Sequence, residues 1–386
     1  MSVLSDHIFP RFTILRLLAL SGVLFASSAT ANELVQLGEA LFFDTNLSAN
    51  RTQACASCHD PAAAFSDSRD NGISGAVSLG DDGESLGDRN APTITYAMLI
   101  PVFGRDTHGE IAGGTFHDGR AASMLEQAGQ PFTNPIEMAL SDKGAVVKRV
   151  HENPAHADAL KQHFGETIFD DTVKAFAAIT ESIVAFEQMP QFAPFDSKYD
   201  RYLRGEYKLS KQEEVGRKLF FSQLFNCHSC HLIDTREDQE YEAFSNHRYH
   251  NIGLPVNAAV RQENGLGSAH VDQGLLENPD IDDPLQAGKF RVPTLRNVAV
   301  TGPYMHNGIF RDLRTVVLYY NKFTLSNAES QTNPETGQPW GESEVPDTVN
   351  LDLLSQGQPI SALQVGAIVE FLNALTDQRY EGLIDQ

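Results

Sequence analysis

The stretch CHSCH at residues 227–231 decides the fold of this chain, because the same pattern occurs once more as CASCH at residues 55–59. In a Cys-x-x-Cys-His motif, the two thiols bond to the vinyl groups of a haem and the adjacent histidine binds its iron. All four cysteines of the chain lie in these two motifs. The sequence therefore predicts two covalently bound haem c groups. The cysteines and axial histidines expected to hold them are Cys55, Cys58, His59, Cys227, Cys230 and His231.

Paired cysteines also serve other chemistries. A single Cys-x-x-Cys can be a redox dithiol, and four thiolates together can hold one zinc ion or form two disulfides. Each of these readings leaves the histidine that follows both motifs unexplained. Haem accounts for all the residues of the pattern, while the dithiol and zinc alternatives stay open at this point.

Length and charge narrow the function. The chain has 386 residues, and domains usually run to about 100–200 residues, so two domains are expected. Its 41% hydrophobic and 21% charged residues are typical of an ordinary globular protein. A formal net charge of −22 argues against nucleic acid as a partner, and it favours a basic protein partner only weakly.

The first 31 residues read as a signal peptide (1–31). Arg11 and Arg16 flank an apolar run at 17–26, and Ala-Thr-Ala at 29–31 fits the small-residue cleavage pattern. The run is shorter than the ~20 residues of a membrane-spanning helix, so no transmembrane segment is expected. Export agrees with haem c, which is attached outside the bacterial cytoplasm. We therefore expect a periplasmic protein, with the cell surface as the alternative.

A short repeat indicates internal duplication. LGEALFF at 37–43 and VGRKLFF at 215–221 both end in Phe-Phe shortly before a haem motif. The expected fold is mainly α, with N-terminal and C-terminal haem domains at 32–205 and 206–386 that meet near Gly205. Helices are expected at 33–43, 145–164, 170–186, 211–221, 314–320 and 361–375, and long loops at 67–90, 234–288 and 331–358. Three histidines are expected at the surface: His151, His156 and His163.

Four further segments carry a family resemblance: LGEALFFDTNLS (37–48), RNAPT (89–93), DGRA (118–121) and FRVPTLRNVAVTGPYMHNG (290–308). With them, the chain resembles the bacterial di-haem cytochrome c peroxidase superfamily. It is closer to the MauG-type branch, which oxidises residues of a partner protein, than to peroxidases fed by small cytochromes. The resemblance implies two cytochrome c-like domains packed face to face, with one calcium ion between them.

The same resemblance assigns roles to residues. The N-terminal haem is the peroxide site, with Glu137 as the distal acid and Gln127 beside it. The C-terminal haem carries electrons, and Tyr320 stands where cytochrome-fed relatives have a methionine ligand. Calcium would bind to Asn90 and to the backbone carbonyls of Thr301 and Pro303.

Some of these roles have alternatives, and at two positions the chain differs from the family pattern. Tyr320 could instead be a core residue, and Met305 and His306 are other potential ligands, although the family segment places them away from the iron. Most relatives have tryptophan between the haems, where this chain has His117, and imidazole carries oxidising equivalents poorly. Phe225 replaces a surface tryptophan of the best-known MauG-type enzyme.

An absence points to an open first haem. No histidine occurs between His59 and His108, so the loop after the first motif offers no second histidine ligand. We therefore expect an oxidoreductase that acts on hydrogen peroxide and oxidises a protein substrate. One alternative is a peroxidase that takes electrons from a small cytochrome or cupredoxin. The other is a non-enzymatic di-haem electron carrier, which would need two six-coordinate haems.

Overall fold

The computed structural model describes residues 32–232 and 241–384, so the predicted signal peptide and part of the predicted loop at 234–288 lie outside the described residues. The described chain is mainly helical. After a first helix at residues 32–42, the α-helices are α2 (Cys55–Cys58), α3 (Met124–Gln127), α4 (Lys143–Glu152), α5 (Pro154–Phe164), α6 (Thr172–Glu187), α7 (Lys198–Leu203), α8 (Lys211–Phe220), α9 (His228–His231), α10 (Ala258–Glu263), α11 (Leu313–Tyr319), α12 (Leu351–Leu354) and α13 (Ala362–Asn373).

Strands are a minor part of the fold. They form three antiparallel two-residue pairs: β1 (Gly104–Arg105) with β2 (Ile111–Ala112), β3 (Tyr249–His250) with β4 (Phe290–Arg291), and β5 (Thr332–Asn333) with β6 (Gln338–Pro339). In the second pair, Tyr249 lies opposite Arg291 and His250 opposite Phe290. This pair brings His250 to the wall of a cavity described below.

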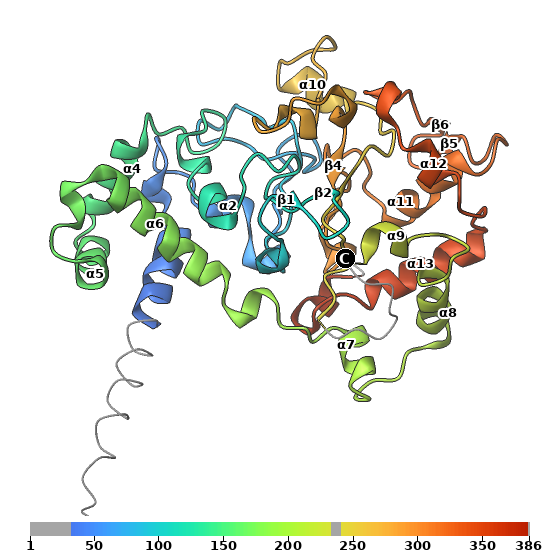
Figure 1. Ribbon diagram of the computed structural model, residues 1–386, viewed down its shortest axis with the longest axis horizontal. Helices are drawn as coiled ribbons and strands as arrows, with labels where there is room; N and C mark the ends of the chain where they lie inside the picture. The colour runs from blue at the N-terminus through green and yellow to red at the C-terminus, as the bar shows by residue number, and fades with distance from the viewer. Residues whose placement is uncertain (1–31, 233–240, 385–386) are drawn as a thin grey trace, which may run out of the picture.

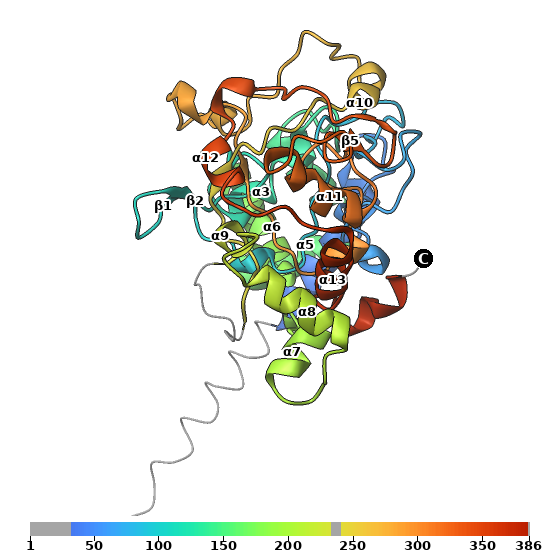
Figure 2. The same ribbon diagram turned by 90° about the vertical axis from the view of Figure 1, so that its right-hand side faces the viewer.

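Two lobes, each with its own hydrophobic core, make up the molecule (Figure 1). The N-terminal lobe holds the first helix with α4, α5 and α6, and its core includes Phe42, Phe132 and Phe186. The C-terminal lobe holds α8, α11 and α13, with α7 at its edge (Figure 2). Phe220 and Phe371 lie in this second core.

The two lobes repeat one helix pair, as the repeated heptapeptide predicts. A Cβ atom added to Gly38 would lie 1.9 Å from the carbonyl oxygen of Ser182 in α6. One added to Gly216 would lie 1.8 Å from that of Ala367 in α13. In both lobes glycine therefore lets two helix backbones approach closely. The rings that follow pack alike, with centroids 5.3 Å apart in Phe42–Phe186 and in Phe220–Phe371.

The single helix predicted at 145–164 is wrong, because the chain forms α4 and α5 there. Pro154 has no backbone N–H to continue a helix, and it suits a first helical position. The side chain of Asn153 caps α5 by accepting a hydrogen bond from the Ala155 N–H. His156 of α5 is buried rather than at the surface, and its Nε2 lies 3.0 Å from an Asp44 carboxylate oxygen.

A buried ionic cluster joins the two lobes. Arg89, near the end of the loop predicted at 67–90, lies 2.5 Å from Asp118 of the same lobe. It also forms ion pairs of 2.6 Å with Asp272 and 2.8 Å with Glu277, both from the C-terminal half. The domain boundary near Gly205 stays a prediction, although Tyr199 of α7 already packs in the second core.

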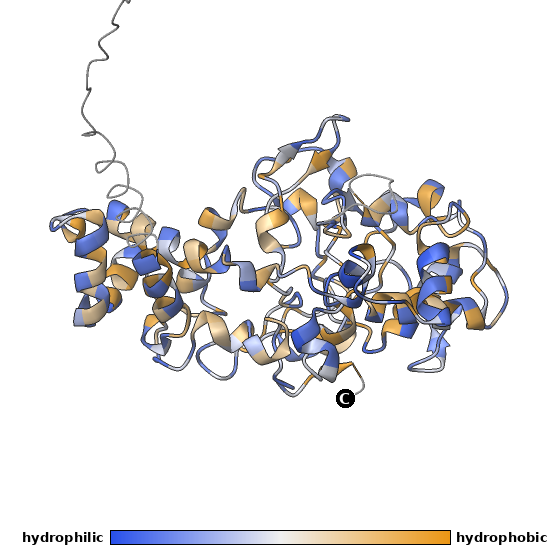
Figure 3. Ribbon diagram, turned by 90° about the horizontal axis from the view of Figure 1, so that it is seen from below, coloured by the Kyte–Doolittle hydropathy of each residue, from blue (hydrophilic) through white to orange (hydrophobic). Residues whose placement is uncertain are grey.

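Hydrophobic and hydrophilic residues are mixed along the helices (Figure 3). Among the described residues, no helix combines the length and the apolar character that a membrane crossing requires.

Candidate functional site

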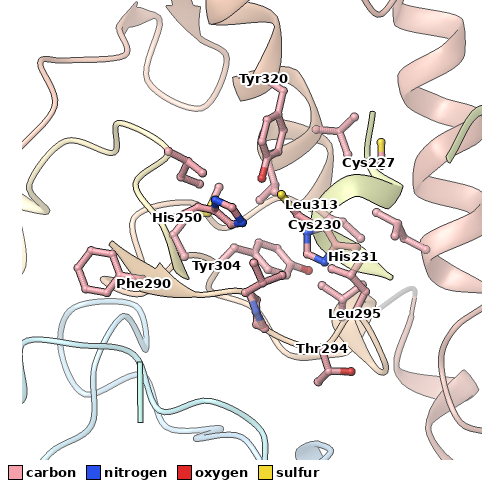
Figure 4. Close-up of a pocket in the computed structure, with 18 of the residues that line it drawn as sticks. Cys227, Cys230, His231, His250, Phe290, Thr294, Leu295, Tyr304, Leu313 and Tyr320 are labelled. Carbon is pink, nitrogen blue, oxygen red and sulfur yellow. The ribbon is translucent and has the colours of Figure 1, made fainter. Parts of the chain in front are cut away.

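A cavity of about 320 Å³ lies beside the second motif. Cys227, Cys230 and His231 border it from α9 and the residue before α9, and Tyr320 borders it from the end of α11. Figure 4 shows the hydroxyl end of Tyr320 directed into this cavity. Much of the remaining wall is aliphatic, including Leu295, Leu313, Val316, Val317, Ile368 and Leu372.

Both motif histidines are held in the same way. Nδ1 of His231 lies 3.0 Å from the carbonyl oxygen of Phe244, and Nδ1 of His59 lies 3.1 Å from that of Phe65. Because a carbonyl only accepts, each Nδ1 carries the proton, which leaves Nε2 with a free lone pair. Burial lowers the pKa of His231 to about 4, so the ring is neutral. Both rings thus have the form that binds a metal through Nε2.

The donor set fits haem c better than it fits a disulfide or zinc site. All four cysteines are unpaired. Burial raises the pKa of Cys58 to about 11, which favours the neutral thiol that adds to a vinyl group. In the described chain, no three His, Cys, Asp or Glu side chains gather as a metal cluster, as zinc would require. Two thiols and a neutral imidazole on an apolar cavity match a covalently attached haem.

Tyr320 occupies the position expected of an iron ligand. Its side chain lines the cavity, and burial together with nearby Cys230 and Cys227 raises its pKa. Its neighbour Tyr319 does not line the cavity and donates to the carbonyl oxygen of Gly253, at 2.5 Å. The helix thus presents one tyrosine to the cavity and uses the other to anchor the fold.

His250 lines the same cavity and was missed by the sequence reasoning. Its Nε2 is buried and has no hydrogen-bond partner, while Nδ1 lies 3.4 Å from Asn350 Nδ2. Burial lowers its pKa to about 4. His250 follows no recognisable motif, and only the β3–β4 pairing brings it to the cavity, so nothing in the sequence could have identified it.

The N-terminal motif has a charged neighbour instead. Arg69 Nη2 lies 3.2 Å from Cys58 Sγ and 2.6 Å from a carboxylate oxygen of Asp67. From the sequence, both residues were expected only to lie in the long loop at 67–90. Their spacing, acid and base two residues apart just after a haem motif, was the one available signal.

Glu137 lies close to this first motif. Burial raises its pKa, and the positive charge of Arg120 opposes the rise. Its carboxylate is near enough to Cys58 to affect the thiol. The Glu137 carbonyl accepts a 2.8 Å hydrogen bond from the Asp81 N–H, which fixes the turn that carries it. A partly desolvated carboxylate on a fixed turn suits proton transfer.

Gln127, the last residue of α3, is joined to this turn. Its carbonyl accepts from the Gln130 N–H at 2.9 Å, and the Pro131 carbonyl accepts from the Met138 N–H at 3.2 Å. The two predicted distal residues therefore stand on one hydrogen-bonded segment.

The predicted calcium and inter-haem residues also meet at one place. Asn90, Thr301, Pro303 and His117 line the large cavity on the side where the lobes join. Nε2 of His117 donates to the Asn90 carbonyl oxygen at 2.9 Å, and burial lowers the pKa of His117 to about 4. The Asn90 side-chain amide donates to Ala76 at 3.1 Å, which leaves its oxygen free for a cation.

The alternative ligands Met305 and His306 line the cavity as well. The His306 ring stacks on Phe290 with centroids 3.5 Å apart and planes at 11°. Its carbonyl oxygen accepts from the Asn90 N–H at 2.7 Å. These contacts tie His306 to the joint between the lobes.

Comparison with known proteins agrees with this geometry. A family model described as di-haem cytochrome c peroxidase matches residues 32–208. Over 376 residues the chain is 49% identical to the methylamine utilization protein MauG of Paracoccus denitrificans strain Pd 1222, covering 96% of this chain and 97% of that protein. It is 33% identical to the cytochrome c peroxidase Ccp of Escherichia coli K12, covering 71% of this chain and 50% of that protein.

A solved structure extends the agreement to three dimensions. The di-haem peroxidase BthA of Burkholderia thailandensis E264 superposes with a TM-score of 0.78 at 31% identity, covering 91% of this chain and 87% of that chain. The chain therefore belongs to the di-haem cytochrome c peroxidase family, as an oxidoreductase that acts on hydrogen peroxide and uses two haem c groups.

Proposed function

We propose that this chain is a periplasmic peroxidase that reduces hydrogen peroxide at the N-terminal motif and oxidises residues of a protein through the C-terminal motif. The observation that carries the proposal is Tyr320 at the C-terminal cavity, which Cys230 and His231 also line. Tyrosine there is typical of the MauG-type branch, and the identity to a protein named MauG supports the same assignment.

Each haem, when bound, supplies an iron that reacts with peroxide or stores oxidising equivalents. Glu137 takes the proton of the bound peroxide and returns it to the departing oxygen, so that water leaves. Its raised pKa suits both halves of that transfer, because a carboxylate of low pKa would not give the proton back. Gln127 orients peroxide or water by hydrogen bonds.

At the second motif, His231 and Tyr320 come from two elements that line the same cavity, and they would hold the haem iron there. An anionic phenolate stabilises higher oxidation states, as hard anionic donors do. Tyr320 thereby allows one oxidising equivalent to be held away from the peroxide site. Substrates can then be oxidised at the surface of the C-terminal lobe.

A second function has specific support. His117 and Phe225 stand at positions where the family's protein-oxidising route uses tryptophan, and both line the cavity. Relatives named cytochrome c peroxidase also match the chain. The alternative is therefore a peroxidase that detoxifies peroxide with electrons from a small cytochrome or cupredoxin.

We also assign one calcium ion to the joint between the lobes. The free side-chain oxygen of Asn90 and the carbonyls of Thr301 and Pro303 are hard oxygen donors, which calcium prefers. Within the described chain, no hydrogen bond is made to either carbonyl. Calcium removal by a chelator is expected to change the His117–Asn90 contact and with it the coupling between the haems.

The test is low-temperature electron paramagnetic resonance (EPR) of the air-oxidised protein before and after one equivalent of peroxide, without reductant. The proposal expects one high-spin and one low-spin ferric signal, both lost together on mixing. Two low-spin signals that do not respond until one electron is supplied would instead assign the chain to the cytochrome-fed peroxidases.

A further inference from the structure

A row of aromatic rings leads from the C-terminal cavity to the surface. Tyr96 is 2% exposed and lines the cavity together with Cys230 and His231. Its ring centroid lies 5.0 Å from that of Phe195, at an interplanar angle of 77°. Phe195 in turn lies 5.0 Å from Tyr241, which is 66% exposed. One buried and one exposed phenol thus contact the two sides of a single ring.

Tyr96 has an unusual partner for a buried tyrosine. Its hydroxyl donates to Oδ1 of Asp377 at 2.5 Å, from the N-terminal lobe to the C-terminal one. The other oxygen of Asp377 accepts from the Asn297 side-chain amide at 2.8 Å. Both oxygens of Asp377 thus accept hydrogen bonds, and Oδ1 is placed to take the proton of the Tyr96 hydroxyl.

A cation sits against the same rings. Arg296 Cζ lies 5.1 Å from the Tyr96 centroid and 5.0 Å from that of Phe195. Its Nη1 is paired with Asp200 at 2.5 Å, and the side chain is 1% exposed. Loss of an electron from Tyr96 without its proton would place a second positive charge beside Arg296, which is unfavourable. Oxidation of Tyr96 is therefore favourable only if its proton leaves with the electron.

We propose that Tyr96 is a redox-active tyrosine that relays oxidising equivalents from the haem sites to the surface at Tyr241, with Asp377 as its proton acceptor. The O–H bond of Tyr96 breaks, its electron goes to the peroxide-oxidised enzyme, and its proton forms an O–H bond on Asp377. The products are a neutral phenoxyl radical and a neutral carboxylic acid. The return electron comes through Tyr241, which releases its own proton to water, and Asp377 gives the proton back to Tyr96.

Tyr249 and Tyr319, two other buried tyrosines, have a different kind of partner. The hydroxyl of Tyr249 donates to the Gly113 carbonyl at 2.6 Å, and that of Tyr319 donates to the Gly253 carbonyl at 2.5 Å. A backbone carbonyl is far too weak a base to take a phenolic proton. Burial raises the pKa of Asp377, which increases its affinity for a proton. The proposal rests on the proposed function, and it supplies a surface route where Phe225 replaces tryptophan.

The test is freeze-quench EPR after one equivalent of peroxide, without partner protein, on the wild type, Tyr96→Phe and Tyr249→Phe. Each substitution removes only a hydroxyl from a buried ring, so Tyr249→Phe is the matched control. We expect a tyrosyl radical signal in the wild type and in Tyr249→Phe. Incorporation of ring-deuterated tyrosine should narrow this signal. The signal should be absent from Tyr96→Phe. An undiminished signal in Tyr96→Phe overturns the proposal.

Proton transfer to Asp377 and radical transfer to Tyr241 are tested by two separate measurements. The radical is expected to form more slowly in D2O than in H2O. Equal rates in the two solvents would exclude Asp377 as the proton acceptor. The solvent comparison needs no Asp377 variant. A nitroso spin trap followed by mass spectrometry is expected to label Tyr241 in the wild type and to lose that label in Tyr96→Phe. Labelling of Tyr241 that is independent of Tyr96 overturns the relay.

The ferric signals in the same samples separate this proposal from the proposed function. Their loss without any tyrosyl radical overturns the relay and leaves the proposed function standing. Their persistence counts against the proposed function, and a flash-generated ruthenium oxidant with persulfate then replaces peroxide. Under the flash, a radical that depends on Tyr96 supports the relay, and the absence of one overturns it.

Discussion

The two haem-motif regions share their construction up to the proximal histidine and differ beyond it. In both, a glycine lets two helices pack backbone to backbone, two phenylalanine rings lie 5.3 Å apart, and a histidine Nδ1 donates to a phenylalanine carbonyl. Beyond the histidine, the first region has Glu137 and Arg69, whereas the second has Tyr320 and His250.

This difference shows how the same helix pair can support two sites with different chemistry. The shared part positions a neutral imidazole, and it does not determine which other residues would face a bound haem. Those residues would come from segments outside the repeated helix pair: a fixed turn in the first region and the end of α11 in the second. Each prediction below changes one of these parts and asks whether the other region responds.

The largest effect is expected from Glu137→Gln, which breaks the first region alone. Loss of a general acid–base group costs about 10²–10⁴-fold in rate, so the peroxide reaction should slow by that factor while both haem spectra stay unchanged. Stopped-flow absorbance after mixing with peroxide measures this. Glu166→Gln, an exposed acid of the same lobe, is the control. An unchanged rate would remove Glu137 from the mechanism.

The second largest effect is expected from substitution of the two shared glycines, Gly38→Ala and Gly216→Ala. The new Cβ would lie 1.9 Å and 1.8 Å from a carbonyl oxygen, so the helices must separate. Overpacking of this kind costs up to about 3 kcal/mol, and we expect a similar loss of unfolding free energy in both variants. Chemical denaturation followed by absorbance of the haems measures it.

Gly366→Ala of α13 is the control, because its Cβ would approach nothing closer than 3.7 Å. A loss in only one of the two glycine variants would show that the lobes are not equivalent scaffolds.

Tyr320→Met sharpens the difference between the regions. Methionine with histidine raises the haem potential relative to anionic ligands, so the C-terminal potential should rise by on the order of 0.1 V. The N-terminal potential should stay the same, because the cavity that Tyr320 lines includes none of Cys55, Cys58 and His59. Spectroelectrochemical titration measures the two haem potentials separately. Tyr319→Phe is the control, since Tyr319 donates to a backbone carbonyl outside the cavity. A shift of both potentials would contradict the assignment.

Sequence reasoning predicted what is encoded locally. The haem motifs, the mainly α fold and the helices that precede each motif follow from short patterns of residues, and the solved relative shares the fold. The error at 145–164 arose because one helix was predicted straight through Pro154, although proline lacks the N–H that would continue a helix. His156 was misplaced because its burial depends on Asp44, more than a hundred residues away.

The parts that could not be predicted depend on contacts between distant segments. Tyr96 meets Asp377, and His250 reaches the cavity through the β3–β4 pairing, yet neither stands in a motif. The family resemblance supplied Glu137, Gln127 and Tyr320. The structure places the charge of Glu137 near Cys58 and Tyr320 at the cavity beside the second motif. Their roles stay predictions until the variants above are measured.

The smallest effect concerns the joint that holds the two regions together. Asp272 is almost fully buried. Burial by itself raises the pKa of its carboxyl group, but the hydrogen bonds and positive charge of Arg89 outweigh the effect of burial and lower the pKa to about 2. A carboxyl with a depressed pKa stabilises the fold above its unfolded value near 4, and loses that contribution as the pH falls through 2. The pKa difference corresponds to about 2 kcal/mol.

Unfolding free energies of the wild type and Asp272→Asn should therefore differ by about 2 kcal/mol at pH 5–7 and converge as the pH falls from 4 toward 2. Asp282→Asn, an exposed neighbour, should show no such convergence. A difference that stays constant down to pH 2 would mean that Arg89 and Asp272 do not titrate as a buried pair. The two regions would then be held together by packing, and the ionic cluster would only set their orientation.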